Sequence, residues 1–474
     1  MTKPHTHSGS GAAVLPRGGG LAMLTRALRY RNYRLFFFGQ GISVIGTWMQ
    51  QTALGWLVYR LTGNKLLLGV VAFCMQIPVF FLAPLAGVIA DRVDRRRLVI
   101  ATQTLALVQA TVLGVLTLAG VVAIWHILVL SAVLGVVNAF DMPTRQSFVV
   151  QMLDSPADLP NALALNSLVV NSARIIGPAI AGQVIFLWGE GRCFLVNAVS
   201  YLAVVIALVA MRVRPRKRVA KHPALLVSLK EGARYVAGSP PIRSVLLLLA
   251  AMSVLGMPYS IQLPVFARDI LHGDSRTQGM LLGAVGVGAV AAVLYLAVRT
   301  SVRGLGRIMA LACGVFGAAL IAFSFSTWLP LSMGLLMVAG FGAVVQIIGA
   351  NTLVQTLVDD DKRGRVMSFH TMCFMGMGPF GNLLIGGLAA GLGSPAAVLL
   401  GGSGCLLAAG AFAMALPHLG RAVHPIYVKM GIAAEPMPNG TLRGDLSPGA
   451  KVLAFSPPGP RSDAGWMSWK QERS

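Results

Sequence analysis

The run GVIADRVDRRR, residues 87–97, sets four arginines and two aspartates between two long apolar stretches. Charged side chains are costly inside a bilayer, so this run marks a turn outside the hydrocarbon core. Over the whole chain, 55% of the 474 residues are hydrophobic and 12% are charged. Because a soluble domain carries about twice that share of charged residues, the composition predicts a membrane protein.

Apolar stretches of roughly 20 residues recur on both sides of this turn, and each is long enough to cross a bilayer core as an α-helix. In lipid the backbone must satisfy its own hydrogen bonds, which favours helices. We therefore predict an all-α membrane protein with twelve transmembrane helices in two six-helix bundles. The predicted helices cover residues 33–58, 66–90, 98–118, 124–148, 162–186, 192–211, 242–266, 277–298, 306–325, 328–352, 366–391 and 394–416.

The two predicted bundles, residues 33–211 and 242–416, are nearly equal in length. Equal halves on either side of a linker are common in secondary transporters built from internal repeats. The cytoplasmic linker, residues 212–241, is basic, and its stretch LLVSLKEGARYVAG fits an amphipathic helix on the membrane surface. We expect residues 1–32 to form a cytoplasmic head. Residues 417–474 are rich in proline, glycine and serine, which predicts a largely disordered cytoplasmic tail.

The distribution of lysine and arginine gives the predicted helices an orientation. The head, the 87–97 turn, the linker and the tail carry most of the basic residues, whereas the loops on the other side carry few. Since basic loops stay in the cytoplasm, we predict that both termini are cytoplasmic and that the protein lies in a bacterial inner membrane. Contact with anionic lipids accounts for the net charge of +23, and we expect no nucleic-acid partner.

The sequence contains no recognisable catalytic set. It has no phosphate-binding loop of the Walker type, no Ser-His-Asp arrangement and no paired carboxylates. The five cysteines fall inside predicted helices and lack the spacing of metal ligands. We therefore predict that the chain is not an enzyme and that it uses no cofactor or metal. We expect its partner to be a small-molecule substrate, and we expect the protein to be a monomer.

Three charged residues lie in or near the ends of the predicted helices. Asp141 and Arg145 are spaced i,i+4, so they share a helix face and can pair, and Pro143 between them weakens the local helix. Arg174 lies in the fifth predicted helix. On one interpretation Asp141 carries a coupled proton and its affinity for that proton is set by Arg145, Arg174 and substrate. On the other, the three residues form a structural charge network near the cytoplasmic helix ends.

Polar side chains are unusually dense in the first predicted helix and recur in several others. Because such side chains seldom face lipid, they either line an aqueous cavity or form hydrogen bonds between helices. The sequence leaves both interpretations open. The candidate cavity-lining residues are Gln40, Ser43, Thr47, Gln50, Asn166, Gln262 and Gln346.

Glycine–proline pairs occur at corresponding places in the two halves. Gly177 and Pro178 lie in the fifth predicted helix, and Gly378 and Pro379 lie in its counterpart, the eleventh. A proline within a helix removes hydrogen bonds, which is tolerated where a neighbour or a cavity satisfies the backbone. The pairs therefore predict helix bends at the interface between the halves, and close packing through small residues is the alternative.

The 87–97 run resembles motif A of the major facilitator superfamily, a Gly-x-x-x-Asp-Arg-x-x-Arg-Arg pattern between the second and third helices. Residue 94 is aspartate where many members have glycine. RIIGPAIAG, from residue 174, is similar to the antiporter motif C. NAFDMPTRQSF with the following NALALN resembles the enterobactin-exporter-like subgroup, the transmembrane secretion effectors. The residues that match motif A are Gly87, Asp91, Arg92, Arg95 and Arg96.

The resemblance covers about residues 26–430 and implies two six-helix bundles, alternating access and export driven by proton influx. It also implies that Asp91 acts at the start of the eleventh helix, near Val366, where a carboxylate is favoured by the helix dipole. Arg145 is the helix-four arginine expected to join that network. These roles concern conformation and not substrate binding.

Taken together, the sequence predicts a secondary active transporter that exports a small amphipathic organic molecule, such as a drug or a siderophore, in exchange for protons. An importer or a lipid transporter on the same scaffold is an alternative, because a fold does not fix the substrate. A non-transporting membrane partner or sensor, which docks through the linker and the tail, is another.

Overall fold

The computed structural model describes residues 25–211, 225–299, 301–302, 304–359 and 361–429. Residues up to Val423 form one compact unit, and the residues from His424 form a second. Residues 1–24 of the predicted head, 212–224 of the predicted linker and 430–474 of the predicted tail lie outside the described residues. The last helix continues to Lys429, so the first residues of the predicted tail are helical.

Every element of regular secondary structure in the described chain is a helix. The first bundle contains α2 (Arg31–Thr62), α3 (Lys65–Arg92), α4 (Arg95–Leu118), α5 (Ile124–Val149), α6 (Leu159–Trp188) and α7 (Glu190–Ala210). The second contains α9 (Pro240–Ala251), η4 (Met252–Gly256), η5 (Met257–Gln262), α10 (Leu263–Val265), η6 (Phe266–Ile270), α11 (Ser275–Val298), α12 (Leu305–Ser324), α13 (Leu329–Leu357), α14 (Arg363–Thr371), η7 (Met372–Gly376), α15 (Gly378–Leu392) and α16 (Ser394–Lys429). Short helices η1 (Arg26–Arg29), η2 (Val150–Met152), η3 (Pro156–Asp158) and α8 (Leu225–Gly238) lie between or before them.

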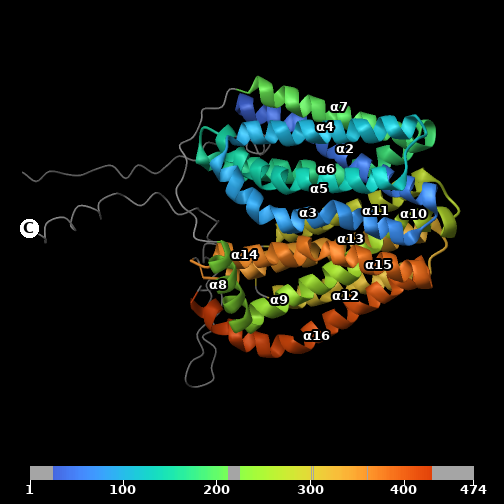
Figure 1. Cartoon of the computed structure of the whole chain (residues 1–474). Helices are drawn as coiled ribbons and strands as arrows, with labels where there is room; N and C mark the ends of the chain where they lie inside the picture. The colour runs from blue at the N-terminus through green and yellow to red at the C-terminus, as the bar shows by residue number, and fades with distance from the viewer. Residues whose placement is uncertain (1–24, 212–224, 300, 303, 360, 430–474) are drawn as a thin grey trace, which may run out of the picture. The chain divides into compact units, whose positions relative to one another are not determined.

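These elements form twelve membrane-length segments, which confirms the predicted fold class (Figure 1). Eleven of the segments in the described chain are long and apolar enough to cross a membrane. The exception is α2, because Gln40, Gln50 and Gln51 lower its hydropathy although it is 32 residues long. The seventh and eleventh segments are not uniform α-helices: each contains π-helical turns, at η4 and η6 and at η7. Such turns are local irregularities that often occur at functional positions.

Helix caps in the loops explain why the segments end where they do. Gly63 adopts a left-handed conformation (φ 60°) that closes α2, and the Asn64 side chain accepts hydrogen bonds from the first backbone N–H groups of α3. Asp94, the departure from motif A, accepts a hydrogen bond from Arg97 N at 3.1 Å and so caps α4. Aspartate is among the strongest N-cap residues, which accounts for its presence in this turn.

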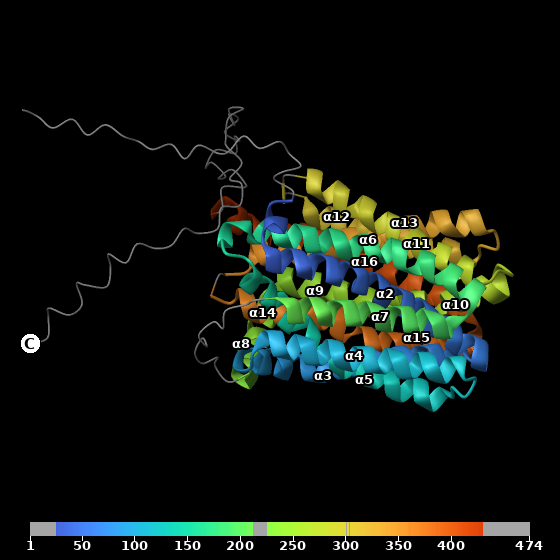
Figure 2. The same ribbon diagram turned by 90° about the horizontal axis from the view of Figure 1, so that it is seen from above.

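Two helix pairs join the bundles: α6 packs on α11, and α3 packs on α15 (Figures 1 and 2). We name the two ends of the helices by their loops. The proximal side carries the start of α2 and the α3–α4 loop, and the distal side carries the α2–α3 loop. The amphipathic stretch of the linker forms the helix α8, as the sequence suggests, and α8 packs on α14 through an ion pair of 2.7 Å between Glu231 and Arg365.

Candidate transport pathway between the bundles

At one close approach of the two bundles, small residues of α6 contact small residues of α11. A Cβ atom added to Gly279 would lie 2.5 Å from the carbonyl oxygen of Pro178, and one added to Gly182 would lie 2.8 Å from the carbonyl oxygen of Ser275. The Ser275 hydroxyl also donates a hydrogen bond to Gly182 O at 2.9 Å. The glycines therefore let two backbones meet, in the way that small residues do between transmembrane helices.

Hydrogen bonds reinforce this contact on the distal side. Tyr59 OH donates a hydrogen bond to the Asp269 carboxylate, and Gln278 Nε2 donates to Thr52 O at 3.2 Å. The α3–α15 contact is equally tight, because a Cβ on Gly69 would collide with the backbone of Asn382. Where both partners are described, every hydrogen bond between the bundles lies in the distal half. The structure is thus closed on the distal side.

Arg174 lies near the middle of α6, where this closed contact begins. A Cβ on Gly286 of α11 would lie 3.1 Å from Ile175 Cα and 3.2 Å from Arg174 O. On the proximal side of that point, the same face of α6 carries Ser167 and Asn171, at i−7 and i−3 from Arg174. One face of α6 is therefore polar up to Arg174 and tightly packed beyond it.

The structure separates Arg174 from Asp141. The guanidinium of Arg174 lies over the Trp48 ring, 5.4 Å from its centroid, and its Nε is buried without a hydrogen-bond partner in the described chain. Tyr259 of η5, in the other bundle, is near enough to interact with it electrostatically. Arg174 thus faces the interface between the bundles and does not join the predicted network around Asp141.

Asp141 is buried between α4 and α5, with 4% of its surface exposed. Its Oδ1 accepts hydrogen bonds from Thr102 Oγ1 at 3.0 Å and from Gln103 Nε2 at 2.9 Å, and its Oδ2 lies 3.5 Å from Arg145 Nε. The predicted i,i+4 pairing is present. Helix α5 continues through Pro143 to Val149, so the proline does not end the helix. All these partners belong to the first bundle.

Gln50 belongs to a hydrogen-bond network inside the first bundle. Its Nε2 donates to Gln109 Oε1 at 3.0 Å, and its Oε1 accepts from Asn197 Nδ2 at 2.6 Å. Ser200 extends the network by donating to Asn197 Oδ1 at 2.9 Å. Interhelical bonding between α2, α4 and α7, one of the two interpretations that the sequence leaves open, therefore accounts for Gln50.

The other candidate cavity residues are spread over both bundles. Gln40 and Ser43 are buried, and Thr47 donates to the backbone oxygen of Ser43 at 2.9 Å. Asn166 is half-buried. Gln262 accepts a hydrogen bond from Ser394 at 2.8 Å. Three of the candidates have a buried side-chain polar atom without a hydrogen-bond partner in the described chain: Gln40, Gln262 and Gln346. The same is true of Gln278 on α11.

Both glycine–proline pairs lie at contacts of the interface, but their backbones differ. Helix α6 runs unbroken through Gly177 and Pro178, and Gly177 packs against Trp48. In the eleventh segment the π-helical η7 precedes Gly378 and Pro379, which start α15, and a Cβ on Gly378 would lie 2.7 Å from Gln76 Oε1. Close packing thus explains the first pair, and a helix irregularity accompanies the second.

Residues 24–431 match the family of transmembrane secretion effectors. The chain belongs to that family. Over 353 residues it is 26% identical to the staphyloferrin A transporter of Staphylococcus aureus, covering 74% of this chain and 88% of the relative. Over 393 residues it is 28% identical to the multidrug efflux pump Tap of Mycolicibacterium fortuitum, covering 80% and 93%.

Among solved structures, an inward-facing bacterial homolog of the human lysosomal transporter Spinster matches with a TM-score of 0.61 at 14% identity, covering 86% of this chain and 99% of that chain. The chain is therefore a multi-pass membrane transporter of the major facilitator superfamily, as the sequence predicts, and not an enzyme.

Motif A of this secretion effector is only partly described. The structure gives the backbone of Gly87, Asp91 and Arg92 but not the surroundings of these residues. The predicted role of Asp91 therefore stays a prediction. Arg96 donates from Nε to Leu208 O and from Nη2 to Val209 O, both at 2.8 Å, and so binds the end of α7. Arg95 donates to Ser147 O at 3.4 Å at the end of α5.

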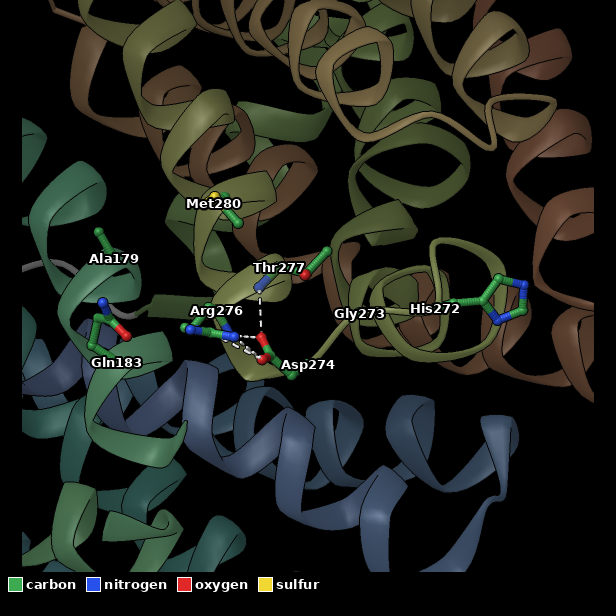
Figure 3. Close-up of a pocket in the computed structure, with 8 residues that line it drawn as sticks. All are labelled: Ala179, Gln183, His272, Gly273, Asp274, Arg276, Thr277 and Met280. Atoms are coloured by element: carbon green, nitrogen blue, oxygen red, sulfur yellow. Dashed lines mark hydrogen bonds and ion pairs between the residues drawn. The ribbon is translucent and has the colours of Figure 1, made fainter. Parts of the chain in front are cut away.

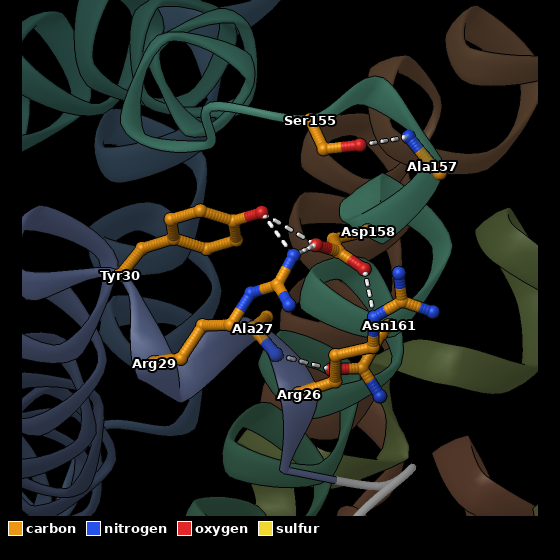
Figure 4. A network of polar contacts seen from close by, with 8 residues as sticks. All are labelled: Arg26, Ala27, Arg29, Tyr30, Ser155, Ala157, Asp158 and Asn161. Atoms are coloured by element: carbon orange, nitrogen blue, oxygen red, sulfur yellow. Dashed lines mark hydrogen bonds and ion pairs between the residues drawn. The ribbon is translucent and has the colours of Figure 1, made fainter. Parts of the chain in front are cut away.

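On the proximal side, Asp158 of the secretion effector anchors η1 to the start of α6 (Figure 4). The carboxylate is 1% exposed and pairs with Arg26 at 2.7 Å and Arg29 at 2.6 Å. Tyr30 OH donates to it at 2.6 Å. Since all four residues belong to the first bundle, this network fixes the chain before α2 and does not connect the two halves.

A cavity of about 580 Å³ opens on the distal side between α6 and the start of α11 (Figure 3). Asp274, on its wall, accepts hydrogen bonds from the backbone N–H groups of Arg276 and Thr277 and from the Arg276 side chain. Burial raises the pKa of Asp274, but these hydrogen bonds outweigh it and hold the pKa below its usual value. Asp274 is thus the N-cap of α11, which assigns it a structural role.

Sequence reasoning missed the residues that pair across helices. Thr102, Gln103 and Gln109 are polar residues in an apolar stretch, a signal of burial, but the stretch does not indicate their partners. Tyr59 and Asp269 lie at helix ends, where polar residues are expected, so no pattern marks them as an interface pair.

Proposed function

We propose that this secretion effector is a proton-coupled exporter of small amphipathic organic molecules that works by alternating access. The proposal is carried by one observation: the bundles meet tightly in the distal half, and a polar face of α6 leads from the proximal side to Arg174, where that contact begins. Two bundles that rock about a site near the membrane midplane are the usual basis of secondary transport.

Relatives support the choice of substrate class. The staphyloferrin A transporter and the multidrug efflux pump Tap are named for a siderophore and for drugs, and export of either kind of molecule fits the proposal. With the basic proximal side in the cytoplasm, the closed distal side faces outward, and both termini are cytoplasmic. Import, lipid transport and a purely sensory role are the alternatives.

The function is tested in proteoliposomes with the full-length protein. The panel contains staphyloferrin A, erythromycin and ethidium, each with an imposed inward proton gradient and without one. Gradient-dependent movement of any member from the compartment on the protein's cytoplasmic side to the opposite compartment supports export. Substrate-induced proton movement supports antiport. Movement in the opposite direction favours an importer, and no movement of any member by correctly folded protein rejects the proposal.

Asp141→Asn is expected to abolish the stimulation of transport by the proton gradient while substrate exchange at equal pH continues. Asparagine keeps the shape of a protonated aspartate but cannot release a proton, so only steps that need the carboxylate should stop. Transport rates at several pH gradients measure the effect. The matched control is Asp154→Asn, at an exposed loop position of the same bundle. Wild-type gradient dependence in the Asp141 variant, with a loss of thermal stability, would assign Asp141 to a structural network instead.

A further inference from the structure

Arg174 is a cation near the middle of α6 for which the described chain supplies no anion. The carboxylates of the neighbouring segments are already engaged: Asp141 with Arg145, Glu190 with Arg60, and Asp269 with Tyr59. The Arg174 Nε is buried without a hydrogen-bond partner in the described residues. A guanidinium at membrane depth is costly unless a partner balances it, so an unpaired arginine at this place indicates that the partner comes from outside the chain.

The surroundings of Arg174 favour an organic anion over an inorganic one. The Trp48 ring lies beneath the guanidinium at 5.4 Å, and Tyr259 of η5, which is 5% exposed, is near enough to interact with it electrostatically. An aromatic ring beneath a guanidinium and a buried tyrosine in its vicinity fit a molecule that has an apolar or aromatic body and one acidic group. Because Trp48 and Tyr259 belong to different bundles, such a molecule would contact both halves of the transporter.

Access to Arg174 follows from the packing of α6. Ser167 and Asn171 continue its polar face towards the proximal side, and Asn171 donates to the backbone of its own helix, at Ser167 O, over 2.8 Å. Beyond Arg174 the contact of Ile175 with Gly286 closes the interface. A ligand that enters from the proximal side would therefore stop at the guanidinium.

We infer that Arg174, with Trp48 and Tyr259, binds a carboxylate group of the transported molecule. This inference rests on the proposed function and narrows its substrate class to amphipathic organic acids. It also gives Arg174 a role separate from proton coupling at Asp141, since no contact joins the two residues within the described chain.

The test uses a matched set of fluorescent probes with the full-length protein in lipid nanodiscs: dansyl-phenylalanine, its neutral amide, and dansyl-cadaverine as the cation. Wild-type protein should bind the acid at least about ten-fold more tightly than the amide. Arg174→Gln should weaken binding of the acid about 10–100-fold, the range expected for a charge-assisted hydrogen bond, and should leave binding of the amide within about two-fold. Arg174→Lys should restore part of the preference, because it keeps the charge but loses the planar fork.

The matched control is Arg192→Gln, at an exposed arginine that donates to Trp188 O on the distal side. It should keep the wild-type preference for the acid. Melting temperature and elution volume establish that each variant is folded, and Trp48→Leu provides a second variant in which all probes should bind more weakly. An unchanged preference in folded Arg174→Gln, or a wild-type preference for the amide or the cation, would overturn the inference.

The outcome also separates the two proposals. Transport of cations or neutral drugs in the proteoliposome panel, without preference for acids, rejects the role of Arg174 and keeps the exporter. Failure of wild-type protein to bind any probe and to transport any panel member rejects both.

Discussion

Gly279→Ala is expected to lower the transport rate about ten-fold while both bundles stay folded. The new Cβ would lie 2.5 Å from the carbonyl oxygen of Pro178, a backbone atom that cannot move aside. Because Gly279 and Pro178 belong to different bundles, the strain is relieved when the bundles part at the distal side. Overpacking costs about 1–3 kcal/mol, which shifts a two-state equilibrium by about 5–150-fold.

Two measurements check this prediction. Transport is measured in proteoliposomes, and the distal gap is measured by spin-label distances between the α2–α3 loop and the start of α11. We expect longer distal distances in the variant. Gly283→Ala is the matched control: it lies one turn further along α11, and its Cβ would have only an ordinary contact, 3.8 Å from Ile175 O. Equal transport by the two variants, or an unchanged distal distance for Gly279→Ala, would contradict the role of this contact as a closure.

Gly288→Ala is expected to prevent stable folding of the second bundle. Its Cβ would overlap the backbone oxygen of Met337 on α13, and Gly340 of α13 packs in the same way against Val285 on α11. These helices share one bundle and cannot part without disrupting it, so the cost falls on folding and not on a conformational equilibrium. We expect a loss of about 3 kcal/mol, at the upper end of typical overpacking costs, or more.

Yield, monodispersity and melting temperature in detergent measure this effect. Gly334→Ala is the control on the facing helix α13, because a Cβ there would meet open space. A melting temperature equal to that of the wild type for Gly288→Ala would show that α11 and α13 can separate at low cost. Gly279→Ala and Gly288→Ala together distinguish glycines that regulate movement from glycines that hold one bundle together.

Much of the fold could be predicted because membrane insertion depends on local properties of the chain. Hydropathy located most of the segments to within a few residues: the stretch predicted at 124–148 forms Ile124–Val149, and that at 277–298 forms Ser275–Val298. The exception is the last helix, which was predicted to end at residue 416 but continues to Lys429. The i,i+4 spacing of Asp141 and Arg145 predicted their pairing for the same reason, since the geometry of one helix fixes it.

The positions of single polar side chains were less predictable. Gln50 could either line a cavity or bond between helices, and only the packing of α2 on α4 and α7 places Gln109 and Asn197 beside it. The spacing of Arg174 from Asp141 suggested a shared network, but α6 turns the arginine towards Trp48 and the second bundle. The sequence gives the residues that share one face of a helix, but it does not give the helix on which that face packs.

By itself, then, the sequence determined that this protein lies in a membrane, and it determined the number of membrane helices, the two-bundle architecture and the family. Hydropathy, loop charge and short motifs are properties of contiguous residues, which is why these features could be predicted. Only the tertiary structure decided which end is closed, that Gly182 and Gly279 close it, and that Arg174 faces the other bundle without a partner in the described chain. Those features depend on contacts between segments about 100 residues apart, and the direction and depth of such contacts arise when whole helices pack.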